Sequence, residues 1–398
     1  MLERAQELSA SLIDLRRRVH RHPELAFQER RTAELIAGRL TELGIAHRTG
    51  VAKTGVVGDL GQEGPCIALR ADMDALPIQE ANEVPYASEV PGVMHACGHD
   101  VHVACLLGAA QLLAEEAAAG RLPGRVRFLF QPAEEAQDEQ DLSGGMRMAQ
   151  EGVMDGVDAV AGLHVWSQLL VGKMAVRDGS VSAYPDTFDV VVKGREAHGA
   201  YPHEGFDAIA IAAQVINAIQ MVPARRLDPT KGKVITVGTI QGGTKDNILA
   251  GEVRMRGTIR TFEPELRETL FAELERACGV AQALGGDFEL TITPGYIPVV
   301  NDPALTALVQ QVGADLLGEE NVEEGELGMG GEDFSYFAQL APGCFFELGG
   351  ATPGEPERQH HHPEFDVDEG CLPVGAALLA ETAMRFLGQA GGSGKGET

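Results

Sequence analysis

The sequence has few basic residues for its length. Its 398 residues include 32 Lys and Arg against 59 Asp and Glu, a formal net charge of −27. A field of that sign repels phosphate backbones and anionic lipid surfaces, so we expect neither nucleic acid nor a membrane as a partner. The charge itself carries no information about the fold.

Cysteine is sparse, and long apolar runs are absent. The six cysteines are unevenly spaced along a long chain, which is unlike a disulfide scaffold. No run approaches the ~18 uncharged apolar residues of a membrane-spanning helix. The first residues, 1–7, are too charged for the apolar core of a signal peptide. We therefore expect a cytoplasmic protein in which a cysteine is free to act as a ligand or nucleophile.

Apolar periodicity predicts an alternation of helices and strands in most of the chain. Residues 3–43 are expected to be helical, with a break near Pro23. Strands are then expected at 55–60, 66–70, 126–130, 157–163 and 344–349, and helices at 100–119, 144–151, 303–317, 332–339 and 370–388. This order predicts an α/β fold with a mainly parallel sheet covered by helices.

The rhythm changes from about residue 186. Strands are expected at 187–193, 233–240, 253–261 and 287–293, and helices at 205–221 and 264–283. The order β-α-β-β-α-β predicts a ferredoxin-like α+β domain. We therefore predict a discontinuous α/β domain from residues 1–185 and 297–390, an inserted domain at 186–296, and a flexible, low-complexity tail at 391–398.

Four groups of side chains are candidate metal ligands. They are Cys97 and His99 within the segment 94–102 (MHACGHDVH), the pair Glu134-Glu135, His164, and the run 360–362 (HHH). Thiolate and imidazole suit zinc, nickel and cobalt. Adjacent carboxylates on an extended chain point in different directions, so one can hold a metal while the other moves a proton.

The placement of these groups indicates one shared site. Asp72 and Asp74, then Glu134 and Glu135, then His164 all fall where a predicted parallel strand ends. In open α/β sheets, ligands bind outside the carboxyl ends of the strands. Taken singly, each group has an ordinary alternative, such as a hydrogen-bonded core histidine or a solvated loop. Their conjunction favours a site for a divalent ion or a pair of ions.

Long motifs in this order resemble the M20 metallopeptidase family. The matching segments are 17–25 (RRVHRHPEL), 70–77 (RADMDALP), 95–100 (HACGHD), 131–135 (QPAEE), 162–164 (GLH) and 361–366 (HHPEFD). They span almost the whole chain. More narrowly, they are similar to its amidohydrolase branch, which includes aminoacylases, hippurate hydrolases and auxin-conjugate hydrolases.

The resemblance implies a metal-dependent amidohydrolase with two divalent ions per subunit (Zn, Mn, Co or Ni). Its substrate would be a small N-acyl amino acid. The implied ligands are Cys97, His99, Glu135, His164 and His361. Glu134 would be the general base, and Asp74 would orient a ligand, with Asp100 and His102 as weaker candidates for that role. Whether Cys97 or His99 bridges the two ions stays open. His361 is preferred to its neighbours because it stands two residues before Pro363, where the family usually has the ligating histidine.

The inserted domain resembles a dimerisation domain, so a homodimer or higher homo-oligomer is expected. The match assigns His198, within residues 194–208 (GREAHGAYPHEGFDA), to the partner's active site as an oxyanion donor. It places Asn247 and Arg260 near the substrate carboxylate, and Gly330, within 328–334 (GMGGEDF), in a loop facing the site. Ala250 stands where the family usually has proline, which puts the shape of that loop in doubt.

Other functions stay open from the sequence alone. A dipeptidase and an N-acetyl-diaminopimelate deacetylase belong to the same family. A non-catalytic metal-binding protein would not need a second carboxylate at Glu134 beside the ligand Glu135. A thiol enzyme would use Cys97 at a helix N-terminus as its nucleophile.

Overall fold

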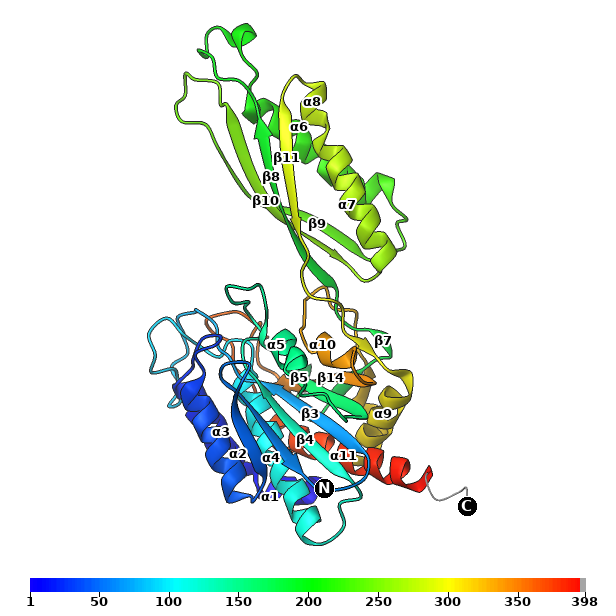
Figure 1. Ribbon diagram of the computed structural model, residues 1–398. Helices are drawn as coiled ribbons and strands as arrows, with labels where there is room; N and C mark the ends of the chain where they lie inside the picture. Colours follow the sequence, from blue (N-terminus) through cyan, green and yellow to red (C-terminus); the bar gives the residue numbers. More distant parts are fainter. Residues whose placement is uncertain (394–398) are drawn as a thin grey trace. The chain divides into compact units, whose positions relative to one another are not determined.

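The computed structural model describes residues 1–393 and divides into two compact units. Unit 1 comprises residues 1–181, 299–326 and 333 onwards, and unit 2 comprises residues 182–298 and 327–332. Figure 1 shows the elements of each unit.

Unit 1 is built on an eight-stranded sheet in the order β1-β2-β4-β3-β5-β14-β6-β13. Its strands are β1 (Ala46–Val51), β2 (Gly55–Leu60), β3 (Cys66–Asp72), β4 (Arg125–Gln131), β5 (Ala159–Leu170), β6 (Met174–Val176), β13 (Val322–Glu324) and β14 (Gly343–Ala351). The central strands β4, β3, β5 and β14 are mutually parallel. Their carboxyl ends therefore lie at one edge of the sheet. A separate pair, β7 (Gly179–Ser180) and β12 (Val300–Asn301), is antiparallel.

Helices cover both faces of this sheet (Figure 1). They are α1 (Leu2–Glu7), α2 (Ser9–Arg21), α3 (Arg30–Glu42), α4 (His99–Ala118), α5 (Gly144–Gln150), α9 (Pro303–Leu317), α10 (Ser335–Ala338) and α11 (Cys371–Ser393), with a 3₁₀ turn at Glu319–Asn321. Because successive strand residues face opposite sides, Leu69 joins the core under α4 and α11 while Ala68 joins the core under α5 and α10.

Unit 2 is a four-stranded antiparallel sheet in the order β11-β8-β10-β9 with helices on one face (Figure 1). Its elements are β8 (Tyr184–Lys193), α6 (Ala208–Met221), β9 (Lys233–Gly242), β10 (Glu252–Thr261), α7 (Pro264–Cys278), α8 (Val280–Ala283) and β11 (Asp287–Thr293), with short helical turns at Pro202–Glu204 and Val222–Arg226. Alternate strand residues such as Val190 and Met255 pack under α6 and α7, whereas Asp189 and Arg254 are exposed on the open face.

The α/β class and the β-α-β-β-α-β order are confirmed, but several details of the prediction are wrong. The first helical stretch is three helices. His164 lies inside β5 rather than at its end, because pairing with β14 continues past it. The expected helix at 332–339 is only α10. Finally, α11 runs to Ser393, and the rest of the expected tail, 394–398, lies outside the described residues.

Three helices are long and apolar enough to cross a membrane by length and composition alone, although none of them is an uninterrupted apolar run. They are His99–Ala118, Ala208–Arg226 and Cys371–Ala390. The apolar character of the first and last has a second explanation, because 67% of each apolar window is buried inside the protein. For Ala208–Arg226 the buried share is only 33%, so much of this helix faces outward.

A buried ion network fastens α2 to the start of α4. The Arg16 guanidinium is fully buried and lies 2.6 Å from Asp100 Oδ2, 3.0 Å from Asp366 Oδ1 and 3.3 Å from Glu369 Oε1. Burial disfavours a charged Asp100, but Arg16 and His20 outweigh it and hold the pKa of that carboxyl far below its usual value. The charges of this network are therefore buried in the core as ion pairs.

We predict that Arg16→Leu lowers the free energy of unfolding of unit 1 by about 3–5 kcal/mol, because the buried Asp100 carboxylate loses its guanidinium partner and keeps only His20 beside it. Urea titration followed by Trp166, the one tryptophan of the chain, measures this unit selectively. Arg18→Leu is the matched control, since Arg18 is 61% exposed on the same helix. Equal stability of the two variants would contradict the prediction.

Candidate metal centre

The candidate residues of unit 1 gather where β5 separates from β3. The pairing of β3 with β5 runs from Ile67↔Ala159 to Arg70↔Gly162 and stops there. On its other side, β3 stays paired with β4 as far as Asp72↔Gln131. The sheet therefore opens at the carboxyl ends of its central strands, and polar side chains occupy the opening.

The N-terminus of α4 delivers Cys97 and His99 to this opening. Between them, Gly98 caps the helix with φ +89°, in the left-handed region that favours glycine. A Cβ on Gly98 would lie 2.3 Å from Val165 Cγ1 on β5. Both the turn and the close packing on β5 therefore require glycine at this position.

The buried Asp74 carboxylate connects two groups of candidate residues. Asp74 Oδ1 and Oδ2 accept the backbone N–H groups of Glu134 and Glu135, each at 3.1 Å. The Nδ1 of His99 lies 2.9 Å from the Asp74 carbonyl and 3.2 Å from Asp74 Oδ1. His99 therefore donates from Nδ1 and keeps Nε2 available as a ligand, as second contacts to ligating imidazoles commonly ensure.

The side-chain donor atoms of the five candidate ligands form two compact groups that share Cys97. The first group is Cys97, His99 and His164, and the second is Cys97, Glu135 and His361. Within each group the donor atoms lie within 4.8 Å of one another. Among the described residues, the buried His99 Nε2 has no hydrogen-bond partner. An orphaned imidazole nitrogen beside a thiol, within a mixed S, N and O set, fits divalent transition metals.

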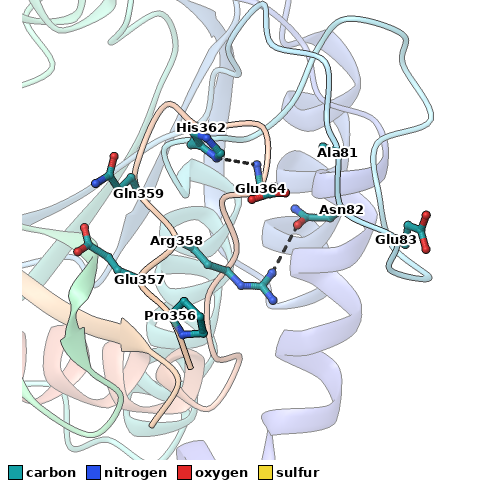
Figure 2. Close-up of a pocket in the computed structure, with 9 residues that line it drawn as sticks. All are labelled: Ala81, Asn82, Glu83, Pro356, Glu357, Arg358, Gln359, His362 and Glu364. Atoms are coloured by element: carbon teal, nitrogen blue, oxygen red, sulfur yellow. Dashed lines mark hydrogen bonds between the residues drawn. The ribbon is translucent and has the colours of Figure 1, made fainter. Parts of the chain in front are cut away.

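Of the three consecutive histidines, His361 is the one that faces this group. Its Nε2 lies 3.0 Å from Glu135 Oε1, and its backbone N–H bonds to the Ala96 carbonyl beside Cys97. His362 instead lines a separate surface pocket of about 450 Å³ with Arg358 and Asn82, and its Nδ1 accepts the N–H of Glu364 (Figure 2).

A fully buried polar network lies behind the ligand groups. Arg70 bonds to Asp72 Oδ2 at 2.8 Å, to Gln131 Oε1 at 2.8 Å and to Asp333 Oδ1 at 3.1 Å. Burial opposes ionisation of Asp72, but Arg70 and the neighbouring imidazoles outweigh it and hold its pKa well below the usual value. From the sequence, Asp72 was a candidate at the end of a strand, whereas Arg70, Gln131 and Asp333 lie inside the quoted motifs without an assigned role.

Glu29 is another residue that the sequence analysis missed. Its buried carboxylate accepts the Thr54 hydroxyl at 2.6 Å and the N–H of Ala133 at 2.9 Å. Ala133 has φ +48°, a strained conformation directly before Glu134. Burial and the charge of Asp74 raise the pKa of Glu29 to about 7. In the sequence, Glu29 is one of several charged residues inside the predicted helical stretch 3–43, and such a residue is too common to be informative.

In unit 2 the predicted residues fall at opposite ends of the sheet. His198 and Ile248 form a β-bridge, and Gly199 N–H bonds to the Asn247 carbonyl, so exposed His198 and Asn247 are neighbours just beyond the start of β10. Arg260 stands at the other end of β10, half-buried opposite Pro185. The nine residues from Glu252 to Arg260, eight steps of an extended strand, span about 26 Å.

Gly330 lies at the Arg260 end of unit 2. Its carbonyl accepts the N–H of Ala183, and the neighbouring Gly331 packs on Pro185. A Cβ on Gly330 would meet no atom within 4 Å, so one side of this loop is open.

Comparisons with known proteins identify the family. The profile described as "Peptidase family M20/M25/M40" matches residues 68–385. The chain is 41% identical over 392 residues to thermostable carboxypeptidase 2 of Saccharolobus solfataricus, covering 96% of each. It is 40% identical over 386 residues to N-acetyl-L-cysteine deacetylase of Bacillus subtilis, covering 96% of this chain and 89% of that one.

A solved structure agrees. The chain is similar to a Bacillus subtilis protein described as a dinuclear metal-binding peptidase of the M20 family, with a TM-score of 0.83 and 36% identity over 96% of this chain and 99% of the other. The chain therefore belongs to peptidase family M20/M25/M40, as the motifs indicated. It is a hydrolase that acts on amide bonds.

We predict that metal binding strengthens steeply as the pH rises. Contacts with Cys97 and Glu135 raise the pKa of His361 to about 10, and burial and Glu135 raise the pKa of the Cys97 thiol. At least one proton therefore resides on these groups at neutral pH and must leave when a metal binds. The apparent affinity should rise about tenfold per pH unit for each proton displaced between pH 6 and 8.

Chelator competition measures this affinity, and Trp166, whose ring centroid is 5.9 Å from that of His164, offers an optical signal. An affinity independent of pH across this range would contradict the assignment of Cys97 and His361 as ligands.

Proposed function

We propose that the protein hydrolyses the N-acyl amide bond of N-acyl amino acids, releasing a carboxylic acid and a free amino acid. Two divalent ions (Zn, Mn, Co or Ni) would be held by Cys97, His99, Glu135, His164 and His361. The observation that carries the proposal is the pair of ligand groups sharing Cys97, with the carboxylate of Glu134 grouped with a ring nitrogen of His99 and the carboxylate of Glu135. These two groups together contain all five proposed ligands and have only Cys97 in common, so Cys97 would be the residue placed to contact both ions.

The ions, when bound, would polarise the amide carbonyl and make a water molecule more acidic. Glu134 is the group that moves the proton: its carboxylate accepts one from the attacking water and returns it to the leaving amine nitrogen. The Asp74 carboxylate bonds to the backbone N–H groups of Glu134 and Glu135 and to His99, so it fixes the two glutamates relative to that imidazole. We assign Arg260 to the substrate carboxylate, because a guanidinium binds two oxygens in a fixed geometry. The open Gly330 loop lies at the same end of unit 2.

The positions of His198 and Asn247 support an oligomeric enzyme. They lie about 26 Å or more along the sheet from Arg260, so one copy of unit 2 cannot present both ends to one small substrate. We infer that His198 acts in the site of a second copy, where it donates to the developing oxyanion. Ala200 N–H bonds to His198 Nδ1, so Nε2 carries the proton that it would donate.

The edge of unit 2 offers the surface for that second copy. β9 ends the strand order, and within residues 1–393 only β10 pairs with it. Ile240 on β9 and Met221 at the end of α6 are more than half exposed, and Ile209 is 50% exposed. An unprotected edge strand beside exposed apolar side chains is typical of a pairing surface.

A Glu134→Gln variant should bind both metals and lose about 10²- to 10⁴-fold in kcat on N-acetyl and N-benzoyl amino acids, because the amide cannot take the proton. Metal content by mass spectrometry and kcat are measured on the same samples. Glu139→Gln, an 85% exposed glutamate five residues later, is the control.

Two outcomes would count against the proposal. Full activity of Glu134→Gln would remove Glu134 from its role, and activity surviving verified metal removal would exclude the metal mechanism. Dipeptides belong in the same panel, because the carboxypeptidase relative supports peptide cleavage as the second candidate. Higher kcat/KM on dipeptides than on every N-acyl amino acid would favour that candidate.

We predict that Ile240→Lys on the exposed edge of β9 weakens self-association and reduces activity together. Sedimentation velocity and kcat are compared over a dilution series. Leu284→Lys, at an apolar residue 45% exposed beyond α8, introduces the same charge away from β9 and should change neither. A monomeric Ile240→Lys protein with full activity would show that His198 is not needed from a second copy.

A further inference from the structure

β5 loses a hydrogen-bonding neighbour within the candidate site. After Arg70↔Gly162 it no longer pairs with β3, while its pairing with β14 continues on the other side. The backbone N–H groups of Val165 and Ser167 lie two residues apart and so point the same way. Val165 N–H bonds to His102 Nε2 at 2.9 Å, and Ser167 N–H bonds to His360 Nε2 at 3.3 Å.

The hydrogen bonds fix the state of both imidazoles. His102 accepts at Nε2, so its proton is on Nδ1, which donates to Asp72 Oδ1 at 2.5 Å. Both nitrogens of His102 are occupied, and the ring is neutral. This excludes His102 from the metal ligands, although its atoms group with those of Asp72 and His99.

His360 is neutral for the same reason. It accepts at Nε2, and its ring lies with its centroid 5.1 Å from that of Trp166 and 4.8 Å from that of Phe365.

His164 lies between these two rings. Its centroid is 4.6 Å from that of His102 and 5.3 Å from that of His360, both in edge contact. Its Nδ1 donates to the Val165 carbonyl at 2.7 Å, and its Nε2 lies 3.4 Å from Cys97 Sγ. The direction of His164 Nε2 therefore depends on the position of the Val165 backbone. His102 fixes that position, because its Nε2 accepts the Val165 N–H.

We propose that His102 and His360 are positioning residues that replace the missing strand neighbour of β5 along Val165–Ser167 and thereby aim His164 Nε2 at the site of Cys97. Arg70, Asp72, His102 and the Val165 N–H form one hydrogen-bonded chain from the end of β3 to β5. The inference rests on the proposed function, because it takes His164 as a metal ligand.

Three substitutions of His102 separate the acceptor from the rest of the ring. His102→Gln keeps an acceptor oxygen near the position of Nε2. His102→Asn keeps a donor near the position of Nδ1 but cannot reach Val165. His102→Leu removes both. If the acceptor matters, Gln resembles the native protein while Asn and Leu share a defect.

The variants are compared as Co²⁺-loaded full-length proteins, by their metal affinity, their cobalt spectrum and their kinetics. For His102→Asn and His102→Leu we expect metal affinity to fall about 10- to 100-fold, with altered cobalt d–d bands and a lower kcat at unchanged KM. His102→Gln should restore the affinity and the spectrum. His47→Gln, at a part-buried histidine on β1 that bonds to the Ile45 carbonyl, should leave all three unchanged.

Several results would overturn the inference: an unchanged cobalt spectrum and affinity in His102→Leu, or a His102→Gln protein as defective as His102→Leu. If the His102 variants do not fold, His360→Phe, which keeps the stacked ring but removes the acceptor, is compared with His360→Gln. Equal cobalt spectra for His360→Phe and His360→Gln would also overturn the inference. His164→Asn separates the two claims, because retention of both metals there refutes the ligand assignment of the proposed function itself.

Discussion

The separation of β5 from β3 after Gly162 is the constraint on which the site depends. Parallel pairing brings the carboxyl ends of β3, β4 and β5 to one edge, but continuous pairing would leave no room between them for ions or water. The divergence creates an opening and also leaves backbone N–H groups that need partners. Side chains supply those partners: Asp74 for the residues after β4, and His102 and His360 for β5.

The same hydrogen bonds sort the site into neutral and charged groups. His99 and His164 use Nδ1 for carbonyl oxygens and so direct Nε2 inward, while His102 and His360 use Nε2 for backbone N–H groups. Histidines of the same cluster therefore have different roles, which depend on which ring nitrogen is hydrogen-bonded to the backbone and which is left for a metal. The buried Arg70 provides a positive charge behind Asp72, in a protein whose formal net charge is −27.

Much of this architecture could be predicted from the sequence, because apolar periodicity is strong in the buried central strands and long helices. The short strands at the sheet margins, such as β6 and β13, carry too few residues for a pattern. The groups of candidate ligands could be found from residue types and their places at strand ends, and the ligand set itself followed from the resemblance of the motifs to the family. The neighbours that orient them could not be found in this way, since Glu29 reaches Ala133 and His102 reaches Val165 only through the tertiary fold. Tautomers, likewise, follow from contacts rather than from spacing.

The proposed metal centre requires that two groups of ligands meet at Cys97. Anomalous diffraction at the zinc edge, from crystals of the zinc-reconstituted protein, is the decisive measurement. We expect two metal peaks in unit 1, with the Cys97 sulfur at about 2.3 Å from both. A single peak, or two peaks of which only one is bonded to Cys97, would contradict it.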